Sequence, residues 1–148
     1  MNVAFVHHGE KTRDDISAPL TQKGREQIHL AADFLKDFGI KPQKIISTST
    51  QRTIESAQII SLSFTNSSLH QRSSIPELWE DWLDFGEELY KSLPEDHIII
   101  GHHTTLGLLK HHFHLKLSLQ SYSSVIILKR NNYHVWSVMM HHQGATSL

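Results

Sequence analysis

Short apolar segments alternate along this chain with segments of helical periodicity, and this alternation constrains the fold more than any other feature of the sequence. A strand buried on both faces is a short continuous apolar run, whereas a helix repeats its apolar residues every three or four positions. The expected order is strand, helix, strand, helix, helix, strand, helix, strand, strand, over residues 3–6, 21–38, 44–47, from 51 onward, 81–93, 97–100, 105–114, 123–129 and 133–140.

This order predicts an α/β fold: a three-layer sandwich with a mostly parallel central sheet and helices on both faces. The last two strands are joined by the short turn Arg130-Asn131-Asn132, and this hairpin should add an antiparallel edge. Residues 61–74 are polar and rich in serine, which predicts a loop with at most a weak strand. A chain of 148 residues without an internal repeat or a long linker predicts a single domain over residues 1–148.

Composition excludes several classes of protein. The formal net charge is −1, so the basic excess of a nucleic-acid-binding protein is missing. The apolar runs are too short to span a bilayer, and the N-terminus lacks the pattern of a signal peptide. Without cysteine, the chain has no disulfide, thiolate nucleophile or Cys-based metal site. We therefore expect a cytoplasmic protein without nucleic-acid or membrane partners, and the sequence leaves the oligomeric state open.

Polar residues gather where three expected strands end. His7, His8 and Gly9 follow the first strand, residues 47–50 and Arg52 follow the second, and His102 comes after the strand at 97–100. The carboxyl ends of parallel strands meet at one edge of a sheet, where ligands of open α/β folds bind. Imidazole and guanidinium groups suit a phosphate ligand. These segments therefore predict a phosphate site at this edge.

Several motifs resemble those of the histidine phosphatase (phosphoglycerate mutase-like) superfamily, in the order found in that family. They are Val6-His7-His8-Gly9-Glu10, residues 20–27 (Leu-Thr-x-x-Gly-x-x-Gln), residues 47–57 (Ser-Thr-x-x-x-Arg-x-x-x-Ser-Ala), Leu78-Trp79-Glu80 with Phe85-Gly86-Glu87, and Ile99-Ile100-Gly101-His102-His103. The matches span most of the chain, and its short length is closest to the SixA-like branch, which dephosphorylates protein phosphohistidine.

The resemblance implies a metal-independent phosphohydrolase without a cofactor. His8 would be the nucleophile that forms a phosphohistidine, and Gly9 would let the backbone turn tightly after it. Arg52 would bind phosphate oxygens, and His102 would donate to them as charge builds. The substrate would be a phosphorylated small molecule or a phosphoprotein.

The acid that protonates the leaving group has two candidates. Glu80 occupies the position of the family's Leu-x-Glu motif, but its spacing to Phe85-Gly86 is longer than expected, which leaves Glu77 as the alternative.

Position 7 departs from the family, which has arginine where this chain has His7. An imidazole is shorter and cannot form a bidentate fork, and the loss of one such donor typically costs on the order of 100- to 1,000-fold in rate. His7 could be cationic and replace the arginine in part, His103 could help, or the protein could bind phosphate without efficient turnover. We expect His7 to limit activity at neutral pH.

Two other functions compete with the enzyme. The first is a pseudophosphatase that binds phosphate and turns it over weakly or not at all, because of His7. The second is a histidine-rich metal-binding protein, since the chain has 13 histidines and His111, His112 and His114 lie on one expected helix. An exposed polar face explains these three better, so no metal site is expected.

Overall fold

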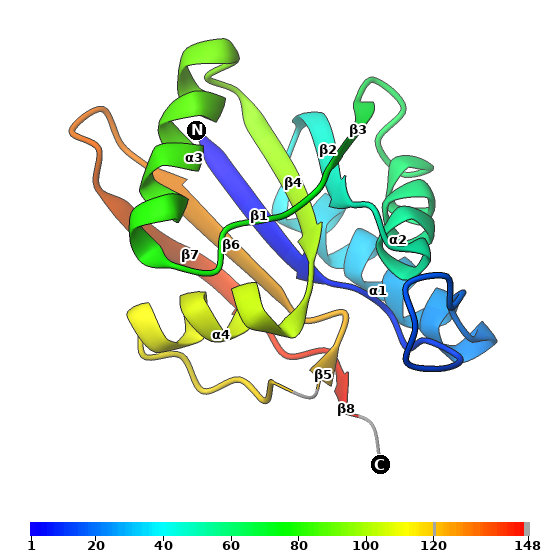
Figure 1. Cartoon of the computed structure of the whole chain (residues 1–148). Coiled ribbons are helices and arrows are strands. Elements are labelled where there is room, and N and C mark those ends of the chain that lie inside the picture. Colours follow the sequence, from blue (N-terminus) through cyan, green and yellow to red (C-terminus); the bar gives the residue numbers. More distant parts are fainter. Residues whose placement is uncertain (120, 147–148) are drawn as a thin grey trace.

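A mixed sheet of six strands, in the order β3-β2-β4-β1-β6-β7, forms the centre of the protein (Figure 1). The structure, a computed structural model, describes residues 1–119 and 121–146. The strands of the sheet are β1 (Asn2–His7), β2 (Pro42–Thr48), β3 (Ser68–Arg72), β4 (Asp96–Gly101), β6 (Val125–Arg130) and β7 (Trp136–His142). The helices are α1 (Gln22–Phe38), α2 (Gln51–Ser61), α3 (Trp79–Ser92) and α4 (His103–His112).

The sheet changes direction at β1. On one side β1 pairs in parallel with β4, which continues in parallel to β2 and β3. On the other side β6 is antiparallel to β1, and β7 is antiparallel to β6. The prediction of a mostly parallel sheet with an antiparallel edge is therefore confirmed. The weak strand allowed for in residues 61–74 is β3, a largely exposed strand at the opposite edge.

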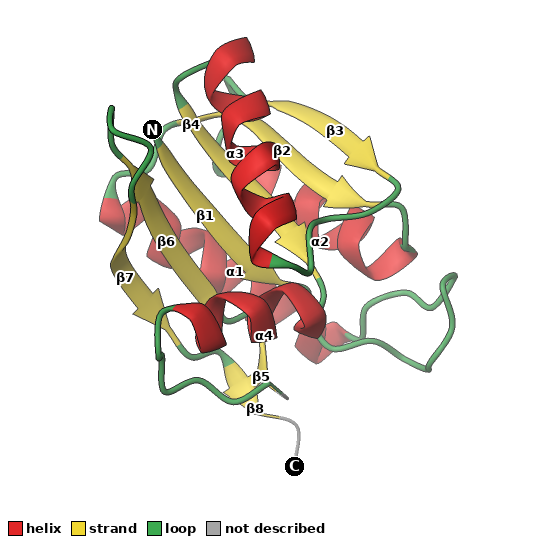
Figure 2. Ribbon diagram, turned by 60° about the vertical axis from the view of Figure 1, so that its left-hand side comes forward, coloured by secondary structure: helices red, strands yellow, loops and turns green. Residues whose placement is uncertain are grey.

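Helices cover both faces of the sheet, as predicted. In Figures 1 and 2, α1 and α2 lie behind the sheet and α3 and α4 lie in front of it. The alternation of side chains along β1 accounts for both layers, because Ala4 and Val6 pack with α1 and α2, whereas Val3 and Phe5 pack with α3 and α4. A strand that is covered on both faces needs an uninterrupted apolar run, which is what the sequence has there.

The first helix begins and ends at residues with the expected chemistry. Thr21 is the N-cap, and its hydroxyl accepts a hydrogen bond from the Gly24 amide at 2.9 Å. Gly39 closes the helix with φ at 94°, a left-handed conformation that glycine adopts without strain. Both signals are local in sequence, which is why the bounds of α1 agree with the prediction.

A small second sheet was not predicted. It consists of β5 (Ser121–Tyr122) and β8 (Ala145–Thr146), which pair in antiparallel fashion beside the carboxyl end of β1. Strands of two residues carry no periodicity, so the sequence gives no local sign of them. Among the described residues, no helix has both the length and the apolar character needed to cross a bilayer.

Candidate active site

The ends of β1, β2 and β4 bring the predicted phosphate-binding residues together. These strands are neighbours or next-neighbours in the sheet and run in parallel. His8 follows β1 directly, and His102 follows β4 directly. Their rings lie edge to face with centroids 5.4 Å apart. A single ligand at this edge can therefore contact both imidazoles.

His8 is buried and is held in one tautomer. Its Nδ1 lies 2.7 Å from the Gly9 carbonyl oxygen, which can only accept a hydrogen bond, so Nδ1 carries the proton. Burial lowers the pKa of His8 to about 2, His7, His102 and Arg52 act in the same direction, and the bond to Gly9 opposes them. At neutral pH the ring is therefore uncharged, with a free electron pair on Nε2. This is the form of imidazole that can attack phosphorus.

Gly9 orients His8 and packs closely against α1. A Cβ at Gly9 would lie 2.5 Å from the Gly24 carbonyl oxygen, so any side chain would push the strand end away from the helix. Among the described glycines a positive φ occurs at Gly39 and not at Gly9, so close approach, rather than the expected tight turn, accounts for glycine here. The Gly9 amide donates to Ser56 Oγ at 3.2 Å, so it is already engaged.

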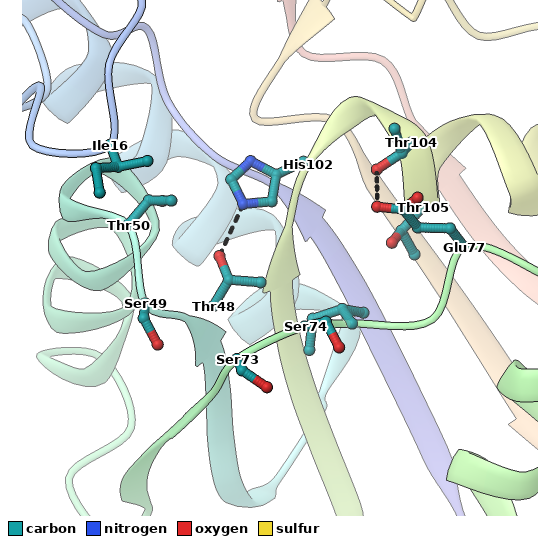
Figure 3. Close-up of a pocket in the computed structure, with 11 residues that line it drawn as sticks. Ile16, Thr48, Ser49, Thr50, Ser73, Ser74, Glu77, His102, Thr104 and Thr105 are labelled. Carbon is teal, nitrogen blue, oxygen red and sulfur yellow. Dashed lines mark hydrogen bonds between the residues drawn. The ribbon is translucent and has the colours of Figure 1, made fainter.

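His102 is fixed by the end of β2. Its Nε2 lies 2.8 Å from the Thr48 hydroxyl, as Figure 3 shows. Thr48 also contacts the Thr53 hydroxyl at 2.8 Å, which ties this group to the first turn of α2. Burial lowers the pKa of His102 to about 4, with Arg52 the next largest cause. An anion bound between His102 and Arg52 would raise the pKa of His102 again and so favour its protonated, charged form.

Arg52 offers a partly open guanidinium at the start of α2. Nη1 donates to the Asp15 carbonyl oxygen at 3.1 Å, whereas Nε is buried and has no partner among the described residues. Burial lowers the pKa of Arg52, and Asp14, Asp15 and Tyr122 oppose this effect. The guanidinium stays charged at neutral pH. A half-buried cation with an unused donor is suited to bind an anion.

A cavity of about 300 Å³ opens beside His102 (Figure 3). Glu77, from the segment between β3 and α3, faces it and accepts a hydrogen bond from the Thr104 hydroxyl at 3.0 Å. The lining does not include His8 or Arg52, but His8 contacts the lining residue His102, and Arg52 follows the lining residue Thr50 in sequence. The lining residues are Ile16, Thr48, Ser49, Thr50, Ser73, Ser74, Ile75, Glu77, His102, Thr104 and Thr105.

Glu80 is not brought to this cavity. It lies in the first turn of α3, exposed, and it is absent from the residues that line the cavity. The structure therefore separates the two acid candidates by position, with Glu77 beside His102 and Glu80 on the helix. The reason is the path of the segment before α3, which reaches the cavity at residues 73–77 and then leaves it.

The side chain of His7 is directed to the backbone of β5. This side chain is buried, and Nδ1 lies against the Ser121 carbonyl oxygen. Burial lowers the pKa of His7 to about 4, the bond to Ser121 opposes this, and His103, His102 and Lys11 act in the same direction as burial. The ring is therefore neutral at pH 7. His103 itself is exposed at the start of α4.

Two residues near the site escaped the sequence-based prediction. Lys11 pairs with Asp14 at 3.0 Å and acts on the pKa of both His7 and His102, so it adds positive charge to this edge. Its position directly after the His-His-Gly-Glu motif could have indicated it. Tyr122 lies against the rings of His7 and His8, and nothing local in the sequence points to it. Among the described residues, no group of three or more potential ligands could hold a metal ion.

Solved structures share this fold over nearly the whole chain. The protein histidine phosphatase SixA, complexed with tungstate, matches with a TM-score of 0.78 and 15% identity, covering 97% of each chain. SixA from Agrobacterium tumefaciens gives 0.67 and 18%, covering 95% of this chain and 97% of that one. A mycobacterial glucosyl-3-phosphoglycerate phosphatase complexed with VO3 gives 0.70 and 14%, covering 99% of each chain. At such identities the likeness establishes the fold alone.

Sequence comparison identifies the family. No curated protein sequence matches the chain. The family model of the histidine phosphatase superfamily (branch 1) matches residues 4–95, which include the motifs around His8 and Arg52. This range covers well over half of the chain, and the protein therefore belongs to branch 1 of the histidine phosphatase superfamily, a superfamily of phosphatase- or mutase-type enzymes.

Proposed function

We propose that the protein is a metal-independent phosphohydrolase that passes a phosphoryl group from its substrate to His8 and then to water. The observation that carries this proposal is the state of His8, a buried and neutral imidazole whose Nδ1 proton is bound to Gly9 and whose Nε2 is free. Arg52 and His102 lie at the same sheet edge and supply the charge and the donors that a phosphoryl group needs.

In the first step, Nε2 of His8 attacks phosphorus and a P–N bond forms. The bond between phosphorus and the leaving atom breaks, and its electron pair stays with the leaving atom. Arg52 and His102 stabilise the charge on the phosphoryl oxygens during transfer. The Gly9 carbonyl accepts from Nδ1 and so favours the positive charge that develops on the imidazole ring.

Glu77 is the acid in this proposal. It faces the cavity beside His102, where we place the leaving group, and its Oε1 accepts a hydrogen bond from the Thr104 hydroxyl. In its protonated form it gives its proton to the leaving atom. In the second step its carboxylate takes a proton from water as the water attacks phosphorus. The P–N bond then breaks, which releases inorganic phosphate and restores neutral His8.

The substrate is a phosphomonoester or a phosphohistidine on a protein. SixA, named as a protein histidine phosphatase, supports the second class through its fold, and the glucosyl-3-phosphoglycerate phosphatase supports the first in the same way. The cavity opens at the surface between loops, and Glu77 itself is exposed, so a phosphate carried on a protein could enter. Hydrolysis of both substrate classes, phosphomonoesters and protein phosphohistidine, should therefore be measured in the same assay series.

The test is to trap the intermediate. The protein is incubated with a ³²P-labelled aryl phosphate or with a phosphohistidine-containing protein, in the presence of a chelator, and quenched with alkali. We expect label that is stable to base, labile to acid and located on His8, and no label in His8→Asn. Label on another residue, or turnover that disappears with the chelator, would contradict the proposal.

A pseudophosphatase is the second candidate, and the neutral state of buried His7 favours it. In that case orthovanadate would bind and compete with inorganic phosphate, but neither substrate class would be turned over above the rate of His8→Asn. Measuring vanadate affinity and turnover on the same preparation separates the two functions.

A further inference from the structure

Tyr122 is a second aromatic neighbour of the nucleophile, in addition to His102. Its ring stacks on His7, with centroids 5.7 Å apart and planes 20° from parallel, and it lies 5.9 Å from the ring of His8. His102 lies 5.4 Å from His8. The ring of His8 therefore has both His102 and Tyr122 as neighbours, although Tyr122 belongs to none of the motifs.

The backbone around Tyr122 is bound to the nucleophile segment. The Ser123 amide donates to the His8 carbonyl oxygen at 3.1 Å, and the His7 amide donates to the Ser124 carbonyl oxygen at 2.9 Å. The Gly144 amide donates to the Ser124 hydroxyl at 3.0 Å, which fastens the neighbouring strand β8 segment to the same turn. Tyr122 is thus held in position relative to His8 by several bonds.

His7 leaves a donor missing from the phosphate site. Its Nδ1 proton is directed to the Ser121 carbonyl oxygen, which can only accept. In the neutral ring the other nitrogen, Nε2, then has no proton and can only accept as well. A phosphoryl oxygen also only accepts once it is ionised, so His7 gives it no hydrogen bond. A donor must come from elsewhere if the group is to be held on this side.

Tyr122 is the candidate for that donor. Its ring stacks on His7 and lies beside the ring of His8, so its hydroxyl is a neutral O–H donor carried by a side chain that contacts both histidines. We propose that the Tyr122 hydroxyl donates a hydrogen bond to the phosphoryl group bound between His8 and Arg52, and that this phosphate-binding contact stands in for the arginine absent at position 7. The inference rests on the proposed function for the identity of the bound group.

The primary test is Tyr122→Phe, which removes the hydroxyl and keeps the ring that stacks on His7. We expect kcat/KM to fall on the order of 100-fold, the effect of losing one such donor, and orthovanadate affinity to fall at least about tenfold. Tyr133→Phe is the matched control, since Tyr133 is 84% exposed, and it should change neither value. The thermal midpoint of Tyr122→Phe should match that of the wild type.

A second test asks whether the hydroxyl replaces an arginine. In a His7→Arg background the guanidinium supplies the donor, so the additional loss caused by Tyr122→Phe should shrink to about threefold or less. The proposal is overturned if Tyr122→Phe alone changes kcat/KM and vanadate affinity by less than twofold. It is also overturned if the loss is equally large in a folded His7→Arg background.

These outcomes are separable from failure of the proposed function. If the wild type forms no phosphohistidine, the phosphohydrolase proposal fails, but calorimetric titration of Tyr122→Phe with orthovanadate still decides whether the hydroxyl binds the anion. If His8 is labelled and Tyr122→Phe behaves as the wild type, the function stands and the role of Tyr122 is rejected.

Discussion

On the β4 side of His8 the neighbouring groups are Thr48, Arg52 and His102, which come from the ends of parallel strands and the start of α2. We call these the parallel flank. On the β6 side the neighbours are His7, Ser121 and Tyr122, which we call the antiparallel flank. The parallel flank holds a cation and a second imidazole that faces a cavity, whereas the antiparallel flank is neutral, aromatic and bound to a backbone carbonyl.

The two flanks differ in how they act on His8: one is charged and polar, and the other buries the ring. In the proposed reaction, the parallel flank supplies the positive charge and the hydrogen-bond donors that stabilise the phosphoryl group. The antiparallel flank removes water from the two adjacent histidines and keeps both rings neutral. Variants of the parallel flank should therefore mainly change catalysis, and variants at His7 should also change how stability depends on pH.

Removing the nucleophile that both flanks serve should have the largest effect. His8→Asn cannot accept the phosphoryl group, so kcat should fall on the order of 10⁴-fold or more. His111→Asn is the control, because His111 is exposed on α4. Steady-state hydrolysis of an aryl phosphate measures both. Activity of His8→Asn within tenfold of the wild type would mean that another group is the nucleophile.

Replacing each candidate acid separately should show which of them acts beside the parallel flank. Glu77→Gln should lower kcat about 1,000-fold on a phosphomonoester with a poor leaving group and much less on an activated aryl phosphate, which needs no acid. Glu80→Gln should leave both rates unchanged, because Glu80 lies on α3 away from the cavity. The reverse pattern would restore Glu80 as the acid.

Arg52→Lys keeps the charge of the parallel flank and removes the planar fork. We expect a loss in kcat/KM of about 100-fold, together with weaker inhibition by orthovanadate. Arg25→Lys, at a half-buried guanidinium that pairs with Glu55 between α1 and α2, is the matched control and should stay within about threefold. Equal losses in the two variants would indicate a structural role for Arg52.

Burial of the histidines by the antiparallel flank should make the free energy of unfolding depend on pH. The pKa values of His7, about 4, and His8, about 2, lie below the 6.5 of an unfolded chain, so the unfolded state binds more protons below pH 6.5. Stability should therefore fall as pH falls, by roughly 2 kcal/mol for each ring between pH 7 and pH 5. Urea unfolding at both pH values measures this, and His7→Gln should show a smaller loss. An identical loss in wild type and variant would exclude His7.

The parallel flank could largely be predicted from the sequence. His8, Arg52 and His102 each follow or adjoin an apolar run, and the convergence of parallel strand ends is a general rule that needs no coordinates. The bounds of α1 were predictable for a similar reason, since Thr21 and Gly39 act within their own turn. Local chemistry and strand order together were sufficient here.

The antiparallel flank could not be predicted. The tautomer of His7 depends on the carbonyl of Ser121, which lies 114 residues further along the chain. Tyr122 reaches the site through two-residue strands without a sequence pattern. The choice between Glu77 and Glu80 depended on the path of the segment before α3, because each is a glutamate next to a helix start and their sequence surroundings do not separate them.

The central claim is that one anion is bound by His8, Arg52 and His102 together. A crystal structure of the protein soaked with tungstate at neutral pH tests it most directly. We predict that the anion lies within bonding distance of His8 Nε2 and within hydrogen-bond distance of the Arg52 guanidinium and the His102 ring. Tungstate bound elsewhere, or the three side chains directed to separate surfaces, would contradict the account.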